Sequence, residues 1–366
     1  TLAGYKEYNV NTLLIEDVAT KLDENITAVT NYVLNANSWN KEGVQMKFDA
    51  VVGNPPYQEM TGGYGTQAKP IYNLFINMSK SIDSKYISMI TPSRWFSGGM
   101  GLNEFRKDML NDTCLTKIID YPNTRDVFDS ADIAGGVNYF LWDKNNKIEC
   151  EVTNVINNVK YSSSRNLNEF NTFVRFNQAI PIIRKVFNVQ ENGKTLENVV
   201  SPQKPFGLPT NYKPKDKGVP CWFIQKIGKR YADLKDIHDE NKLLNKWKLL
   251  VPRSPIAGQT DFTKPVGFYY DGNTNIAKPG ECCTESFIVA GAFDTEEEVK
   301  NFKSYLFTKT VRFLLLQAVV SQDVLRNKFC FVPDLGKYDR IYTDKYLCEK
   351  WNITDDEWKY IDSRIK

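Results

Sequence analysis

The chain has 366 residues, enough for about two domains of ~150 residues each, and its 42% hydrophobic and 25% charged residues exclude a disordered protein. The net charge of +3 identifies no partner by itself. The seven cysteines form no Cys-x-x-Cys pair and His238 is the lone histidine, so we expect reduced thiols, no metal site and no Ser-His-Asp or Cys-His catalysis. Without a signal peptide or an apolar run of ~18 residues, we expect a soluble cytoplasmic protein with no membrane partner.

The first 47 residues offer few signals. The chain starts with Thr rather than Met, from which we expect a trimmed or partial chain. Residues 11–16 predict a strand that is followed by Asp17, and residues 26–35 predict a helix. No Gly-rich turn of the G-x-G type occurs in this region.

The next segment is a strand followed by a stiff loop. The apolar run at residues 48–52 predicts a buried strand, and Gly53 allows a sharp turn at its end. Two prolines then fix φ and remove two amide donors, so their carbonyls have few competing partners. We expect this loop at the carboxyl edge of a sheet, where open α/β sheets bind ligands. It presents the amide of Asn54, the prolyl carbonyls of Pro55 and Pro56, and the aromatic ring of Tyr57.

Alternating strands and helices follow. Apolar residues at helical spacing predict helices at 70–82 and 102–110, and β-prone runs predict strands at 85–91, 115–121, 137–143 and 150–156, the last as a hairpin partner. This order predicts an α/β fold with a parallel sheet that ends in antiparallel strands.

The second half of the chain has a different composition. Prolines and glycines are frequent from Ser201 onward, and residues 201–260 hold 12 Lys and Arg against 5 Asp and Glu. We predict short strands at 222–227, 247–251 and 266–270, a helix that begins at the capping box Thr295–Glu298, and a buried helix at 311–319. The basic, aromatic and proline-rich mixture favours a DNA-facing surface, with a solvated face as the alternative.

The residue types of the opening loop suit one kind of chemistry. The exocyclic amine of a nucleobase is a poor nucleophile because its lone pair is delocalised into the ring. An Asn oxygen and a prolyl carbonyl can accept its two N–H hydrogens and localise that lone pair without a general base. An aromatic ring can stack on the base, worth ~1–3 kcal/mol, against the cost of flipping the base out of a duplex.

Asn54-Pro55-Pro56-Tyr57 after a hydrophobic strand resembles the catalytic motif of S-adenosylmethionine-dependent DNA amino-methyltransferases, in the Asn-first form typical of N6-adenine enzymes. Residues 69–75, 86–93 and 136–144 resemble the segments that follow in that family. The order of motif and C-terminal module resembles the gamma class, especially the fused chains of type IIG restriction–modification systems. The resemblance covers residues 45–160, and the C-terminal part more loosely through 204–209, 251–253 and 329–333.

The resemblance implies a fold and a set of partners. It implies a Rossmann-like methyltransferase sheet, N-terminally incomplete, followed by a smaller α+β target recognition domain. We place the boundaries at 1–160 for the catalytic region, 161–200 for a linker helix and 201–366 for the recognition domain. The implied partners are S-adenosylmethionine, double-stranded DNA with a flipped adenine, and other parts or subunits of a restriction–modification complex.

The resemblance also implies residue roles. Asn54, Pro55 and Tyr57 would be catalytic, and Trp142, with Phe140 as second choice, would sandwich the base against Tyr57. Pro56, Phe75 and Asp17 would lie near the cofactor. The expected DNA contacts are Arg94, Lys204, Arg253 and Arg326. Packing in the core is the alternative for Trp142 and Phe75, and a solvated or ion-paired arginine is the alternative for Arg94.

The sequence departs from the family at one point. A Gly-rich cofactor loop and an acidic residue for the ribose precede the motif in the family, and neither is recognisable here, with Asp17 as a possible remnant. These parts would lie in a missing N-terminal segment or on another chain, or else cofactor binding has been lost. Two alternative functions follow: a DNA-binding specificity fragment without cofactor, and a protein-glutamine methyltransferase, since the same motif suits a glutamine amide.

Overall fold

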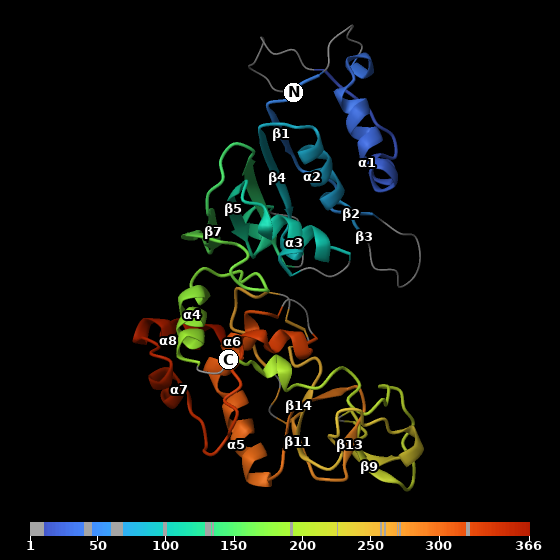
Figure 1. Ribbon diagram of the computed structural model, residues 1–366, viewed down its shortest axis with the longest axis vertical. Helices are drawn as coiled ribbons and strands as arrows, with labels where there is room; N and C mark the ends of the chain where they lie inside the picture. Colours follow the sequence, from blue (N-terminus) through green and yellow to red (C-terminus); the bar gives the residue numbers. More distant parts are fainter. Residues whose placement is uncertain are drawn as a thin grey trace. The chain divides into compact units, whose positions relative to one another are not determined.

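The computed structural model describes residues 11–39, 46–59, 69–97, 101–128, 133, 135–190, 193–224, 226–256, 258–259, 261–268, 270, 272–319 and 323–366. The chain forms two compact units, Thr1–Phe173 and Val174–Lys366 (Figure 1). The segment predicted as a linker is shared between them, because residues 159–165 form a strand of the first unit and residues 179–189 a helix of the second.

The first unit is built on a six-stranded sheet with the order β1-β4-β6-β5-β7-β8. The strands are β1 (Ala50–Gly53), β4 (Tyr86–Pro92), β5 (Leu115–Tyr121), β6 (Val137–Asp143), β7 (Cys150–Ile156) and β8 (Val159–Arg165). β1 is parallel to β4 and β5 is parallel to β7, whereas β6 runs antiparallel between β4 and β5. The chain is therefore α/β, but its sheet is mixed. β7 is the parallel neighbour of β5 and forms its hairpin with β8, not with the strand at 137–143.

Helices and short ladders complete the first unit. They are α1 (Val18–Leu34), α2 (Tyr72–Ser81), α3 (Asn103–Asn111), the 3-10 turns η1 (Ala36–Trp39), η2 (Ser93–Ser97) and η3 (Thr124–Asp126), and the short strands β2 (Gln58–Glu59) and β3 (Lys69–Pro70). The apolar stripes of α2 and α3 pack on one face of the sheet through Tyr72, Ile76, Phe105 and Met109. This layer explains the helical spacing that the sequence shows at 70–82 and 102–110.

Two strand predictions in the first unit need correction. Residues 11–16 do not form a strand, and Leu14 is 79% exposed, because an apolar run becomes a strand only where a neighbouring strand can pair with it. The strand at 48–52 exists as β1, but it is not buried: Val52 is 76% exposed. Within the described residues β1 pairs with β4 alone, so it lies at the edge of the sheet.

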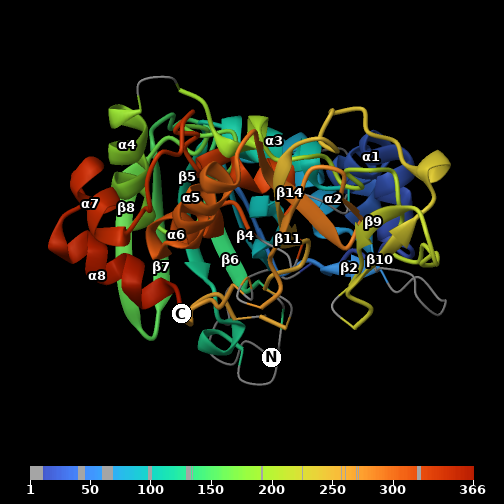
Figure 2. The same ribbon diagram turned by 90° about the horizontal axis from the view of Figure 1, so that it is seen from below.

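The second unit combines two small sheets with helices. One sheet has the order β10-β9-β13 and the other β12-β11-β14. Their strands are β9 (Val219–Trp222), β10 (Lys229–Ala232), β11 (Trp247–Pro252), β12 (Asn275–Ala277), β13 (Cys282–Cys283) and β14 (Phe287–Phe293). The helices are α4 (Ala179–Val189), α5 (Glu296–Phe307), α6 (Lys309–Leu316), α7 (Asp344–Lys350) and α8 (Asp355–Arg364), with 3-10 turns η4 (Leu196–Asn198), η5 (Leu234–Asp236) and η6 (Arg326–Phe331). Figure 2 shows α5 beside β11 and β14.

The sequence signals of the second unit are confirmed in part. The Thr295 hydroxyl accepts the N–H of Glu298 at 3.2 Å and caps α5, as its capping sequence predicts. The strand at 247–251 is β11. The strand at 222–227 begins earlier, as β9, and residues 266–270 make only an isolated bridge from Val266 to Ile365. The unit is α+β, and at residues 174–366 it is the larger of the two units rather than the smaller.

Candidate functional site

The carboxyl ends of β1, β4 and β5 meet at one edge of the sheet. The parallel register of β1 and β4 pairs Gly53 with Met89, so Asn54 begins its loop where β4 approaches its end at Pro92. β6 starts at the same edge, because Val137 pairs with both Pro92 and Tyr121. Four chain segments therefore converge here, as expected for the ligand-binding edge of an α/β sheet.

A cavity of 840 Å³ opens at this edge. Its walls come from the loop after β1, the start of α2, the end of β4 and the loop before β6. The lining residues are Asn54, Pro55, Pro56, Tyr57, Gln58, Pro70, Tyr72, Pro92, Arg94 and Ile133. The whole Asn-Pro-Pro-Tyr motif and Arg94 are thus brought together, and the volume lies in the range that binds small molecules or a single nucleobase.

The motif is held in place by the chain that follows it. β2 and β3 pair antiparallel, with Gln58 opposite Pro70, and the Ile71 N–H donates to the Tyr57 carbonyl at 3.3 Å. Pro55 is buried, whereas Asn54 and Pro56 are exposed. The loop is therefore anchored at its second and fourth residues, and the Asn54 amide is left accessible.

Two tyrosines form the aromatic part of the wall. Tyr57 is half-buried, and its hydroxyl lies in the protein without a hydrogen-bond partner among the described residues. Burial raises the pKa of Tyr57, so the ring is neutral at physiological pH. Tyr72 is buried against Phe105 edge-on, with ring centroids 6.2 Å apart. Burial also raises the pKa of Tyr72, and the nearby Arg94 guanidinium offsets only part of this shift.

A buried polar network lies beneath the cavity wall. The Ser93 hydroxyl donates to Asp120 Oδ1 at 2.8 Å, and the Asn154 amide donates to Asp120 Oδ2 at 3.3 Å. The Asn138 amide donates to the Ser93 hydroxyl and to the Thr91 carbonyl, each at 3.3 Å. All five residues are buried, Asp120 completely. The network joins the ends of β4, β5, β6 and β7, and so fixes the turn that carries Arg94.

Gly136 closes the other side of this wall. It has φ +79, and a Cβ at this position would lie 2.1 Å from the Tyr121 carbonyl oxygen. Its N–H donates to the Ile133 carbonyl at 2.9 Å, and its carbonyl accepts from the Ser93 N–H at 3.0 Å. Only glycine permits this backbone path, which couples the Ile133 wall to the Ser93 turn.

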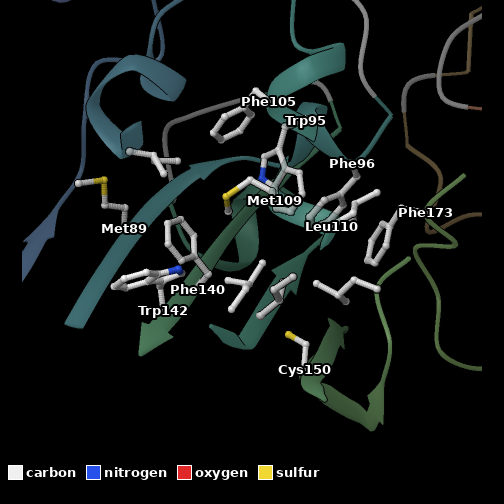
Figure 3. Close-up of a cluster of buried hydrophobic side chains, with 14 of the residues drawn as sticks. Met89, Trp95, Phe96, Phe105, Met109, Leu110, Phe140, Trp142, Cys150 and Phe173 are labelled. Carbon is white, nitrogen blue, oxygen red and sulfur yellow. The ribbon is translucent and has the colours of Figure 1, made fainter. Parts of the chain in front are cut away.

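The expected second stacking wall is corrected by the structure. Trp142 and Phe140, 9% and 1% exposed, belong to the hydrophobic core between the sheet and α2 and α3 (Figure 3). Trp142 pairs with Ile87 near the start of β4, at the far end of the strand from Pro92, and its indole N–H donates to Asp112 at 2.8 Å. These positions contradict a stacking role for either residue in the Asn54 cavity, because core packing occupies both rings.

Of the three residues expected near a cofactor, only one lines the cavity. Pro56 lines the cavity. Phe75 is half-buried on α2 and is not among the cavity-lining residues, so its role stays a prediction. Asp17 is exposed at the N-cap of α1 with φ 50, and it does not line the cavity either. No Asp or Glu occurs among the described residues that line the cavity.

The other expected DNA contacts belong to the second unit and carry internal partners. Lys204 Nζ lies 3.5 Å from Glu285, and Arg253 Nη1 lies 3.0 Å from the same carboxylate. Arg253 Nε also lies 3.6 Å from Asp323. Arg326 donates to the Glu197 carbonyl at 2.7 Å. Lys204 and Arg253 are therefore brought together, but around a shared negative charge.

The described residues contain neither a metal-binding cluster nor a membrane-spanning helix. No group of three or more His, Cys, Asp or Glu residues there is arranged to hold a metal ion. No helix in the same residues combines the length and hydrophobicity that crossing a membrane requires.

Sequence reasoning missed part of the cavity. Tyr72, Gln58, Pro92 and Ile133 line it but were not singled out. A signal for Tyr72 was present: it follows Pro70 in the stretch at 69–75, where the loop returns from β3 to α2. Which of the aromatic residues in that stretch faces the cavity depends on the helix start, and the sequence alone does not fix it.

Comparison with known proteins identifies similar sequences for the first unit. Residues 1–128 match the family described as Eco57I restriction-modification methylase, which is about a third of the chain. A protein of Mycoplasma pneumoniae described as an uncharacterized adenine-specific methylase is 34% identical over 103 residues. That alignment covers 27% of this chain and spans only 24% of the relative's length.

Solved structures give weaker likenesses over more of the chain. The type IIG restriction endonuclease BpuSI is 13% identical, with a TM-score of 0.38, over 84% of this chain and 49% of that one. The type IIL restriction-modification enzyme MmeI, solved in complex with DNA, is 8% identical, with a TM-score of 0.41, over 86% of this chain and 47% of that one. The chain thus spans about half the length of these two proteins.

Proposed function

We propose that this chain is the base-binding and recognition part of a DNA adenine-N6 methyltransferase of a restriction–modification system. The observation that carries the proposal is the single cavity that Asn54, Pro55 and Tyr57 line together. The match of residues 1–128 to a restriction-modification methylase family and the likeness to an adenine-specific methylase support the substrate class.

The lining residues suggest how the amine would be held. The Asn54 side-chain oxygen and the Pro55 carbonyl each accept one N–H of the exocyclic amine, which localises the nitrogen lone pair. The Tyr57 ring stacks on the base, and this contact offsets part of the cost of flipping it from the duplex. The neutral Tyr57 hydroxyl stays buried in the protein, so the ring keeps its orientation. These contacts position and polarise the amine without a titratable base.

The expected methyl donor is S-adenosylmethionine, which supplies an electrophilic methyl group when bound. The described cavity residues do not by themselves fit the whole cofactor, since none is a carboxylate that could hold its ribose hydroxyls or ammonium group. Their assigned roles concern the base alone.

The test uses unmethylated DNA of mixed sequence and radiolabelled S-adenosylmethionine. Together with the parts of the restriction–modification complex that complete the cofactor site, the wild-type chain should transfer label to adenine N6, and Asn54→Ala should lower the rate by about 10²–10³-fold, the usual effect of removing one preorganised hydrogen-bonding group. The matched control is Asn77→Ala, an exposed asparagine of α2 outside the cavity, which should keep the wild-type rate. Unchanged methylation by Asn54→Ala, or label on a glutamine peptide instead of DNA, would contradict the proposal.

The lack of a carboxylate in the described cavity wall favours a second candidate, a DNA-specificity chain that does not bind the cofactor. Calorimetric titration of the chain with S-adenosylmethionine separates the two. Saturable heat supports the methyltransferase. No heat, together with intact DNA binding, supports the second candidate.

A further inference from the structure

The second unit carries a hairpin with an unusual charge balance. β9 and β10 pair antiparallel, and Figure 2 shows them side by side. The segment before β9 extends this layer, because the Lys215 N–H donates to the Tyr231 carbonyl at 2.9 Å. Residues 211–235, which make up the layer, contain seven Lys and Arg against two Asp and no Glu.

Five cations of this layer have no carboxylate at ion-pair distance in the described part of the chain: Lys213, Lys215, Lys217, Lys226 and Arg230. All five are exposed, and the Lys215 ammonium lies over the Tyr212 ring. The two ion-paired cations of the layer are Lys229, which contacts Glu281, and Lys235, which lies 3.4 Å from Asp233. The folded chain therefore concentrates like charge here with little internal compensation, which opposes folding unless an anion is bound.

Four exposed side chains near these cations are apolar or aromatic. Ile224, Ile227, Tyr231 and Leu234 are 39%, 37%, 40% and 65% exposed. Lysines that only keep a protein soluble are usually interspersed with acidic residues. Cations mixed with exposed rings and aliphatic side chains suit a ligand with charged phosphates and apolar sugar and base surfaces. We name this set of exposed cations and apolar residues the hairpin surface.

Two of the DNA contacts expected from the sequence have a carboxylate partner, unlike the unpaired cations of the hairpin surface. Lys204 and Arg253 share Glu285, so much of their charge is already neutralised within the unit. A phosphate at that position would have to compete with a carboxylate. The cations of the hairpin surface have no such carboxylate at ion-pair distance among the described residues.

We propose that the hairpin surface binds the phosphate backbone of duplex DNA. The choice of DNA as the partner rests on the function proposed above, whereas the location rests on the charges and exposures of the hairpin alone. Duplex DNA presents one negative charge per ~1.7 Å of its axis, so several phosphates fall within the span of one hairpin. Contacts of this kind set orientation and affinity and do not read the base sequence.

The test compares two variants with the same change in net charge. The first replaces Lys213, Lys217, Lys226 and Arg230 with Gln. The control replaces four exposed lysines near the C-terminus, Lys337, Lys345, Lys350 and Lys366, with Gln. Binding of a fluorescent 30-base-pair duplex is measured by anisotropy over a series of salt concentrations. Circular dichroism and thermal midpoints establish that both variants are folded.

The hairpin variant should bind at least about tenfold more weakly, and the slope of log K against log salt should fall by roughly three to four, since each phosphate contact contributes ~0.9. The control variant should keep the wild-type affinity and slope. Equal behaviour of the two variants, preference for RNA of the same length, or no DNA binding by the wild type would overturn the inference. Hairpin-dependent DNA binding without methyl transfer would contradict the proposed function alone. Methyl transfer by the hairpin variant, with an unchanged salt dependence of DNA binding, would contradict this inference alone.

Discussion

The two ends of the six-stranded sheet use aromatic residues in different ways. At the carboxyl end of β4, Tyr57 keeps a ring in an open cavity while its hydroxyl is buried. At the amino end of β4, Trp142 is enclosed by the core and its indole is bound to Asp112. The same residue class is therefore accessible at one end and structural at the other. What separates the two is their surroundings: Tyr57 lies in a loop that lines the cavity, whereas Trp142 lies in the core that the sheet forms with α2 and α3.

The largest effect on stability is expected at the closed end. Trp142→Ala should lower the free energy of unfolding by about 3–5 kcal/mol, because it empties part of the core. Urea denaturation would measure this loss. The conservative variant Trp142→Phe should recover much of the stability, and it should bind DNA like the wild type. A specific loss of DNA binding by a folded Trp142→Phe would return Trp142 to the base-binding role.

The buried network under the cavity should show the next largest effect. Asp120→Asn should lower the free energy of unfolding by about 1–3 kcal/mol. The new amide NH2 group would face a buried hydrogen-bond donor, which would then lack an acceptor. Lys117→Met removes an exposed ion pair from the same strand and should cost under about 1 kcal/mol, which makes it a matched control. If the two variants have the same urea midpoint, the network does not hold the end of the sheet as described.

The open end is expected to affect binding more than stability. Tyr57→Ala should weaken binding of DNA that contains an unpaired adenine by about 1–3 kcal/mol through the loss of a stacking face. Tyr57→Phe removes only a buried hydroxyl that has no partner in the described structure, so binding and stability should stay near wild type. Fluorescence titration with a mismatched duplex would measure both variants. A large loss in Tyr57→Phe would mean that the hydroxyl contacts the ligand.

The smallest effect concerns pH at the closed end. Burial opposes ionisation of Asp112, but hydrogen bonds from Lys80 and from the Trp142 indole outweigh it and hold the pKa of Asp112 below its usual 3.8. Because the pKa is lower in the folded state, the ionised carboxylate stabilises the fold at pH values above the unfolded-state pKa. This contribution is lost as the pH falls below about 4 through the folded-state pKa. Asp112→Asn and Lys80→Met should both flatten the pH dependence of the urea midpoint between pH 5 and 3. A wild-type profile in both variants would contradict this account.

The sequence predicted the local backbone structure of the open end and failed where long-range pairing decides. The order of residues around Asn54 predicts a strand, a turn and two rigid prolines, and these appear in the structure, although the strand is an exposed edge strand rather than a buried one. The place of Trp142 was not predictable in the same way, because alternation along β6 says which residues share a face but not which end of the sheet each one reaches. That answer depends on the antiparallel register between β6 and β4, which no local pattern encodes.

Gly136 sets a limit on how the cavity could be redesigned. A library that varies Ile133 and Arg94 changes the two walls that this glycine links through its N–H and carbonyl. Any other residue at position 136 would drive its Cβ into the Tyr121 carbonyl. Nearly all library members with such a residue would therefore lose the local backbone structure that shapes the cavity wall. Keeping position 136 fixed would let a selection for new base preference explore shape and charge while the frame of the cavity is preserved.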